Sequence, residues 1–176
     1  MENKILAILL DCGDTLIDEG TEIKDEMGAT ISADLIPGAR EALLALTAAG
    51  YRLALVADGP ALTFQREFIQ HDLGRFFACL AISELVGCEK PDWRMFEYAL
   101  NGLGIAPADY GRVVMVGNNL SRDIKGANEL GLISIWIDWA PRRAKIPADA
   151  SEAPRYTIKT PAELPALIAA LEAVRA

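Results

Sequence analysis

The sequence predicts an α/β protein built as a three-layer, doubly wound parallel sheet. The first observation is a series of short, nearly continuous hydrophobic runs, which are typical of strands buried on both faces. The second is that segments with a helical spacing of apolar residues separate these runs, which indicates right-handed crossovers between parallel strands. The runs cover residues 5–10, 52–57, 78–83, 112–117 and 132–137.

Helices are expected between these runs. Pro37 and Gly50 delimit the first, and Ser121 and Gly131 delimit a later one, because proline and serine favour helix starts and glycine favours helix ends. The helical stripes cover residues 39–46, 95–103, 121–131 and 164–171, with Pro165 in the first turn of the last. Residues 60–89 have room for one further helix besides the third run. A loop over 138–155 precedes a short edge strand at 156–158.

Length and composition fit a single domain over residues 1–176, with a flap-like hairpin at 18–36 inside it. A chain of this length buries roughly 70% of its unfolded surface on folding. The 52% hydrophobic and 24% charged residues exclude a disordered or fibrous chain.

Charge and cysteine content limit the partners. Lys and Arg number 17 against 25 Asp and Glu, and the resulting net charge of −8 argues against a nucleic-acid or membrane-surface partner. The apolar run at 5–10 is too short to span a membrane. Three cysteines, Cys12, Cys79 and Cys88, form no even set, so we expect free thiols and a cytoplasmic location.

Polar residues follow the strands at one edge of the predicted sheet, where ligands bind in such folds. Asp11, Asp58 and Asn118 each come directly after a hydrophobic run, and Lys90 and Asp123 lie a few residues beyond others. Carboxylate, amide and carbonyl oxygens suit Mg²⁺, a nearby lysine suits a phosphate, and an aspartate beside both can be a nucleophile. Taken singly, the same residues also suit turns and helix caps.

In this order the segments resemble the haloacid dehalogenase-like (HAD) superfamily over nearly the whole chain. Asp11-Cys-Gly-Asp-Thr15-Leu16 is similar to its first motif, and Leu55-Val-Ala57-Asp-Gly59 to its second. Gly87-Cys-Glu-Lys90-Pro91-Asp92 resembles the third motif, and Val116-Gly-Asn-Asn-Leu-Ser-Arg-Asp123 the fourth. The resemblance implies a HAD-like Rossmannoid fold and Mg²⁺-dependent hydrolysis of a phosphate ester.

The resemblance also implies a role for each matched residue. Asp11 attacks phosphorus, and Lys90 holds the nucleophile and the phosphate together. Ala57 and Asp58 join Lys90 in binding the phosphate. The implied metal ligands are Asp11, the Gly13 backbone carbonyl, Asn118 and Asp123. Asp123 has a second interpretation, as a residue that orients Lys90.

Three positions depart from the family pattern. Gly13 replaces the aspartate that serves as general acid and base, a loss that typically costs about 10²–10⁴ in rate. Ala57 replaces a hydroxyl residue, and Asn118 replaces a carboxylate. Asp14, one residue beyond Gly13, is the candidate substitute acid/base, with a turn residue as the alternative interpretation.

The segments that carry cap domains in this superfamily are too short for one here. Residues 18–36 suit a hairpin, and residues 60–89 suit one core helix and one strand. The chain therefore resembles the capless members, in which a second subunit can cover the open site. Arg142, Arg143 and Lys145 follow the last core strand and serve either a substrate anion or a solvated loop.

We therefore expect a cytoplasmic, Mg²⁺-dependent HAD-like phosphohydrolase that acts through an aspartyl-phosphate on Asp11 and is slow because residue 13 is glycine. The alternative is a weakly active or inactive HAD-fold protein that binds phosphate or metal and regulates a partner. Dehalogenation is a minor alternative, because it needs the closed apolar pocket that a cap provides.

Overall fold

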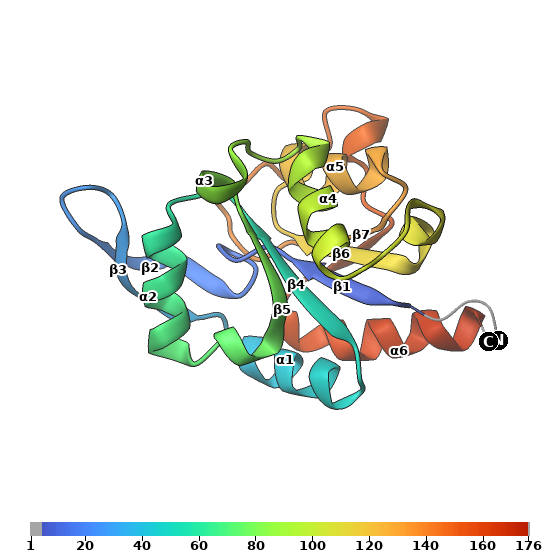
Figure 1. Ribbon diagram of the computed structural model, residues 1–176, viewed down its shortest axis with the longest axis horizontal. Helices are drawn as coiled ribbons and strands as arrows, with labels where there is room; N and C mark the ends of the chain where they lie inside the picture. Colours follow the sequence, from blue (N-terminus) through green and yellow to red (C-terminus); the bar gives the residue numbers. More distant parts are fainter. Residues whose placement is uncertain (1–4, 176) are drawn as a thin grey trace.

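The computed structural model describes residues 5–175 and contains a six-stranded, entirely parallel sheet (Figure 1). The strands run in the spatial order β5, β4, β1, β6, β7, β8. Their bounds are β1 (Ala7–Leu10), β4 (Arg52–Ala57), β5 (Phe77–Ile82), β6 (Val113–Gly117), β7 (Ile133–Ile137) and β8 (Tyr156–Ile158). From β1 the chain builds outward first on one side and then on the other, which is the doubly wound arrangement that the alternating sequence predicts.

Helices cover both faces of this sheet, because successive strand residues point to opposite sides. Ile8 and Leu10 pack into one apolar cluster with α1 (Ala39–Ala48) and α6 (Leu164–Arg175). Ala7 and Leu9 pack into a second cluster with α4 (Trp93–Gly102) and Ala127 of α5 (Lys125–Glu129). In Figure 1, α1 and α6 lie below the sheet and α4 and α5 above it. The three layers predicted from the sequence are confirmed.

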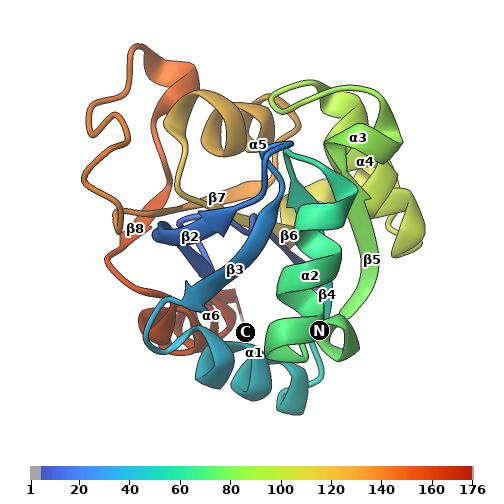
Figure 2. The same cartoon turned by 90° about the vertical axis from the view of Figure 1, so that its left-hand side faces the viewer.

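A separate antiparallel hairpin rises from the carboxyl edge of the sheet (Figure 2). It consists of β2 (Ile17–Lys24) and β3 (Thr30–Leu35), which pair irregularly between Asp18 and Lys24. α2 (Ala61–His71) lies beside it, and the Gln70 amide donates to the Ala33 carbonyl of β3 at 2.8 Å. The hairpin and α2 therefore form one side of this edge of the sheet.

Two segments differ locally from their predicted form. Ser83 opens the short helix α3 (Ser83–Val86) instead of ending a strand. The helix expected from Ser121 to Gly131 starts as one π-helical turn, η3 (Leu120–Ile124), before α5. Short 3₁₀ turns complete the chain: η1 (Gly74–Phe76), η2 (Pro107–Arg112), η4 (Ala150–Glu152) and η5 (Pro161–Glu163).

Within residues 5–175, no helix combines the length and apolarity needed to cross a membrane. The three cysteines are all free thiols, with Cys12 buried and Cys79 and Cys88 half-buried.

Candidate active site

The residues that follow the strands meet in a cleft of about 240 Å³ at the carboxyl edge of the sheet. Asp11 follows β1, Asp58 follows β4 and Asn118 follows β6, and all three line the cleft. Lys90 reaches it from the loop that leads into α4. Asp11 and Asn118, which are 107 positions apart in sequence, therefore lie in the same cleft, as the crossover topology requires.

Lys90 lies at the centre of this cluster. Its Nζ donates to Asp11 Oδ1 at 2.7 Å, to Asp123 Oδ1 at 2.7 Å and to the Val56 carbonyl at 2.8 Å. Burial acts to lower the pKa of this ammonium, but the carboxylates of Asp11 and Asp123 outweigh burial and hold its pKa above the usual range. Lys90 is therefore a fixed positive charge, and each of its three N–H groups donates to one of these acceptors.

Asp123 is fully buried on the π-helical turn η3. Its Oδ1 accepts from Lys90, and its Oδ2 accepts from the backbone N–H of Asn119 at 2.9 Å. Burial and the neighbouring Asp11 raise the pKa of Asp123 to about 7, although Lys90 opposes them. These contacts suit a residue that orients Lys90. The other role predicted for Asp123, as a metal ligand, is not tested by them.

The loop after β4 forms one wall of the cleft through Ala57, Asp58 and Gly59. Both oxygens of the Asp58 carboxylate accept hydrogen bonds from protein groups. Oδ1 accepts from the Lys90 backbone N–H at 3.0 Å, and Oδ2 accepts from Arg122 at 2.9 Å. Gly59 donates its backbone N–H to Ser83 Oγ at 2.9 Å. What Asp58 can offer to a phosphate is thus its main chain, while its side chain holds the Lys90 loop in place.

Three residues with oxygen atoms that could bind a metal ion lie in the cleft where the resemblance implies one: Asp11, Gly13 and Asn118. The Thr15 hydroxyl donates to Asp11 Oδ2 at 3.2 Å, so Asp11 presents one oxygen to Lys90 and the other towards Thr15. The Asn118 amide donates to the Gly13 carbonyl at 2.9 Å. A half-turn of that amide would present its oxygen beside the carbonyl oxygen, a separation that suits two ligands of one ion.

This donor set fits Mg²⁺, which keeps several waters and needs only one or two protein carboxylates. In residues 5–175, no three acidic, histidine or cysteine side chains gather as a metal cage. A cation here would therefore depend on carbonyl and amide oxygens, together with substrate and water. Asp11, the Gly13 carbonyl and Asn118 are the residues that could hold it.

The segment after Asp11 reverses tightly so that β2 starts beside it. Asp14 is completely buried and has a left-handed φ of +52°, which aspartate tolerates in turns. Its Oδ1 accepts from the Glu19 backbone N–H at 3.2 Å and from Arg142. Its carboxylate is thus held between β2 and the loop after β7, and Asp14 does not line the cleft. Its role as substitute acid/base stays a prediction.

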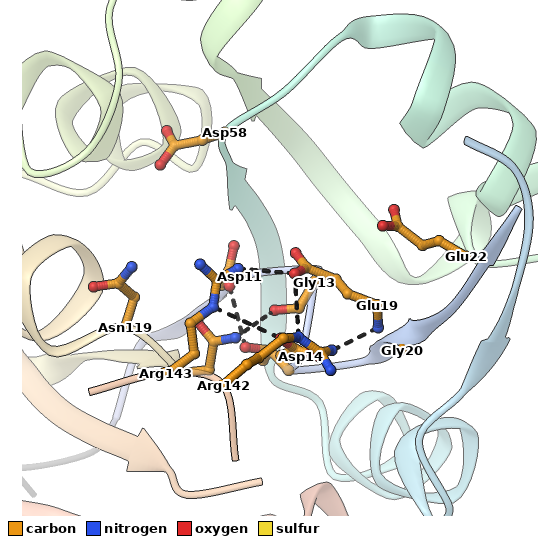
Figure 3. Close-up of polar contacts among 12 residues, drawn as sticks. Asp11, Gly13, Asp14, Glu19, Gly20, Glu22, Asp58, Asn119, Arg142 and Arg143 are labelled. Atoms are coloured by element: carbon orange, nitrogen blue, oxygen red, sulfur yellow. Dashed lines mark hydrogen bonds and ion pairs between the residues drawn. The ribbon is translucent and has the colours of Figure 1, made fainter. Parts of the chain in front are cut away.

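The sequence interpretation did not identify Glu19 as a site residue. Glu19 lies on β2, lines the cleft and turns its carboxylate towards Gly13 (Figure 3). Burial and the charge of Asp14 raise its pKa to about 6, against the opposing effect of Arg143. Its position six residues beyond Gly13 carries no motif signal, because only the turn between them brings the two together.

The basic residues after β7 have two separate roles. Arg142 contacts Asp14, and Arg143 donates to Glu19 Oε2 at 2.8 Å and lines the cleft (Figure 3). Lys145 pairs with Asp138 and lies 5.7 Å from the centre of the Trp136 ring. Arg142 and Arg143 therefore hold the hairpin side of the site, whereas Lys145 belongs to the loop.

Comparisons with known proteins identify the family of the chain. The family model for haloacid dehalogenase-like hydrolases matches residues 22–131, more than half of the chain. A glyceraldehyde 3-phosphate phosphatase from Pyrococcus furiosus is 31% identical over 137 residues, which cover 78% of this chain and 54% of that protein. The chain spans about half the length of the curated relatives it matches.

Solved structures give the same result at the level of the fold. A HAD phosphatase from Thermococcus onnurineus superimposes with a TM-score of 0.75 at 20% identity, covering 93% of this chain and 97% of that one. The putative HAD-hydrolase YfnB from Bacillus subtilis, solved bound to magnesium, has a TM-score of 0.65 at 27% identity, covering 77% and 56%. The chain belongs to the haloacid dehalogenase-like hydrolases.

Proposed function

We propose that the protein is a Mg²⁺-dependent phosphohydrolase that cleaves a phosphate monoester through an aspartyl-phosphate on Asp11. The observation that carries the proposal is the Lys90 ammonium held between Asp11 and Asp123 at 2.7 Å from each, at the edge where strands end. The names of the relatives support it: several are phosphatases, though for different substrates. We also propose that residues 1–176 form a single core domain with the hairpin as its flap.

In the proposed reaction, Asp11 attacks phosphorus with one carboxylate oxygen. Lys90 directs that carboxylate through its hydrogen bond, and its charge balances the phosphoryl oxygens. The main chain of Ala57 and Asp58 donates to the phosphate from the opposite wall. When bound by Asp11, the Gly13 carbonyl and Asn118, Mg²⁺ would offset phosphate charge and polarise the phosphoryl group.

The cleft also supports a requirement for a divalent cation. Among the described residues that line it are six carboxylates (Asp11, Glu19, Glu22, Asp58, Glu67 and Asp123) and four basic side chains (Lys24, Lys90, Arg122 and Arg143). With all groups ionised this leaves two negative charges in excess, which would repel a phosphate dianion. A divalent cation would cancel that excess.

A panel of phosphate esters assayed with Mg²⁺ tests the proposal, with Asp11→Asn as the matched variant. We expect Asp11-dependent turnover of at least one ester. Equal rates in both proteins would overturn the proposal.

The rival is a HAD-fold protein that binds phosphate or metal without turnover, and Gly13, Ala57 and Asn118 favour it. Beryllofluoride, which mimics a phosphorylated aspartate, separates the two. If the protein is the proposed enzyme, beryllofluoride raises its unfolding temperature only when Mg²⁺ and Asp11 are both present. Without that dependence, the non-catalytic rival is favoured.

A further inference from the structure

The space beside Gly13 is filled by a carboxylate from another part of the chain. A Cβ built on Gly13 would lie 2.8 Å from Glu19 Cδ and closer still to Glu19 Oε1. Such distances are below any real Cβ contact, so a side chain at residue 13 would require the Glu19 carboxylate to leave its present position. Glu19 therefore takes the volume in which the aspartate of related phosphatases would stand.

The local fold directs Glu19 to this position. Gly13 forms a β-bridge with Ile17, which starts β2 close beside the first motif. Two residues further on, the Glu19 backbone N–H donates to Asp14 Oδ1 at 3.2 Å and fixes the strand. The Glu19 side chain then turns back over Gly13, where glycine alone leaves room for it (Figure 3).

The two oxygens of Glu19 are in different environments. Oε2 accepts from Arg143 Nη2 at 2.8 Å and lies 3.9 Å from Arg142 Nε. Oε1 faces Gly13, and Glu19, Gly13 and Asp11 all line the cleft. The arginines therefore anchor one oxygen and leave the other beside Gly13, two residues after the Asp11 nucleophile.

We propose that Glu19 is the general acid/base of this enzyme, in place of a residue-13 side chain. The inference rests on the proposed phosphohydrolase function. As the Asp11 oxygen bonds to phosphorus and the phosphorus–leaving-group bond breaks, Glu19 gives its proton to the leaving oxygen. When water then attacks the aspartyl-phosphate and the bond to Asp11 breaks, Glu19 takes the proton from that water.

Two phosphate esters of different leaving groups test the assignment. Nitrophenyl phosphate releases a stable phenolate that needs no proton, whereas an alkyl phosphate releases an alkoxide that does. With Mg²⁺ present, we expect Glu19→Gln to slow alkyl phosphate cleavage by about 10²–10⁴-fold. On nitrophenyl phosphate it should give a rapid burst of about one nitrophenolate per protein followed by slow turnover, with phosphorylated Asp11 detectable by mass spectrometry.

Two further variants complete the test. Asp34→Asn changes an exposed carboxylate of the same hairpin that does not line the cleft, and it should behave as wild type. The double variant Glu19→Ala with Gly13→Asp removes the obstructing side chain and restores an aspartate at residue 13. It should recover alkyl phosphate cleavage relative to Glu19→Ala alone.

The outcomes separate this inference from the proposed function. Asp11-dependent turnover that survives Glu19→Gln on both esters, or falls equally on both without a burst, would overturn the role of Glu19 alone. If Asp14→Asn reproduces the leaving-group pattern and Glu19→Gln does not, the acid/base is Asp14. Turnover that does not need Asp11 would overturn the proposed function and this inference together.

Discussion

Lys90 supports the local structure as well as the proposed chemistry, because its ammonium is almost completely buried and lies between two carboxylates. Its side chain is 3% exposed, and those of Asp11 and Asp123 are 11% and 1% exposed. Removing one partner from such a group leaves uncompensated buried charge, which costs about 3–5 kcal/mol. We expect Lys90→Met to lose that much free energy of unfolding at pH 8.

Urea unfolding measures this loss, and pH provides an internal check. Since Lys90 lowers the pKa of Asp123, that pKa lies above its wild-type value of about 7 in the variant, and the loss should become smaller as the pH falls and Asp123 takes up a proton. Lys145→Met is the matched control, because Lys145 is 38% exposed in its ion pair and should cost at most about 1 kcal/mol. Similar losses of unfolding free energy for the two variants would contradict the structural role of the buried Lys90 ammonium.

Glu67 predicts a second pH effect. It is 3% exposed, accepts from Cys12 Sγ at 3.5 Å, and burial raises its pKa from 4.5 to about 7. The folded protein therefore holds a proton between about pH 4.5 and 7 that the unfolded chain releases, so this residue costs stability as pH rises through that interval.

Glu67→Gln keeps the hydrogen-bond acceptor and removes the charge. We expect it to raise the free energy of unfolding by about 1–3 kcal/mol at pH 8 and to leave it unchanged near pH 4.5. Chemical denaturation at the two pH values measures the difference. The same gain at both would show that packing, and not the buried charge, is responsible.

At the residue scale, the sequence predicted which residues gather but not all of their roles. Asp11, Lys90, Asn118 and Asp123 do meet in one cleft, because parallel strands bring their carboxyl ends to one edge. Glu19 could not be predicted, since the approach of β2 to Gly13 depends on a three-dimensional turn. The contacts of the Asp58 side chain with Lys90 and Arg122 could not be predicted either, because they join segments that no sequence motif connects.

At the scale of elements, the contact between β6 and η3 sets the position of Asp123. A Cβ on Gly117, the last residue of β6, would overlap the Asp123 carboxylate. Gly117→Ala should therefore displace Asp123 and with it Lys90. We expect a loss of about 1–3 kcal/mol in stability and a clear fall in kcat.

Gly74→Ala is the matched control for Gly117→Ala, because a Cβ at Gly74 would meet nothing within 4 Å. Thermal unfolding and steady-state kinetics should show it unchanged. A Gly117→Ala protein with wild-type kcat would mean that Asp123 does not need its present position.

Elements with a strong periodic signal were predicted best. The edge strand Tyr156–Ile158 has the predicted bounds, and Pro165 lies in the first turn of α6, where its missing N–H costs nothing. The π-helical turn of η3 was not predicted, because Ser121 and Gly131 indicate a helix but not its hydrogen-bond pattern. In this turn the Ile124 backbone N–H donates to the Asn119 carbonyl at 3.3 Å, and the Asn119 backbone N–H donates to Asp123 Oδ2 at 2.9 Å.

At the scale of the whole molecule, the order of the hydrophobic runs along the sequence was enough to predict the fold. The net charge of the chain was not enough to predict the charge of the cleft. A chain of net charge −8 concentrates both signs in one place, with six carboxylates and four basic groups among the described residues lining the cleft. Their balance depends on which side chains the hairpin and the loop after β7 contribute. Composition alone cannot give that.

The same charge balance makes the affinity for phosphate depend on a cation. In excess EDTA at pH 9, where Glu19, Glu67 and Asp123 are all ionised, inorganic phosphate should not change the unfolding temperature, because the cleft repels it. With Mg²⁺ present, phosphate at 100-fold above its Kd should stabilise the protein by about 2.7 kcal/mol, or about 5–10 °C. Asp11→Asn removes one of the two excess charges and should allow measurable phosphate binding without metal. Scanning calorimetry of both proteins, with and without Mg²⁺, measures all four cases, and phosphate stabilisation of the wild-type protein in EDTA would show that its basic side chains suffice.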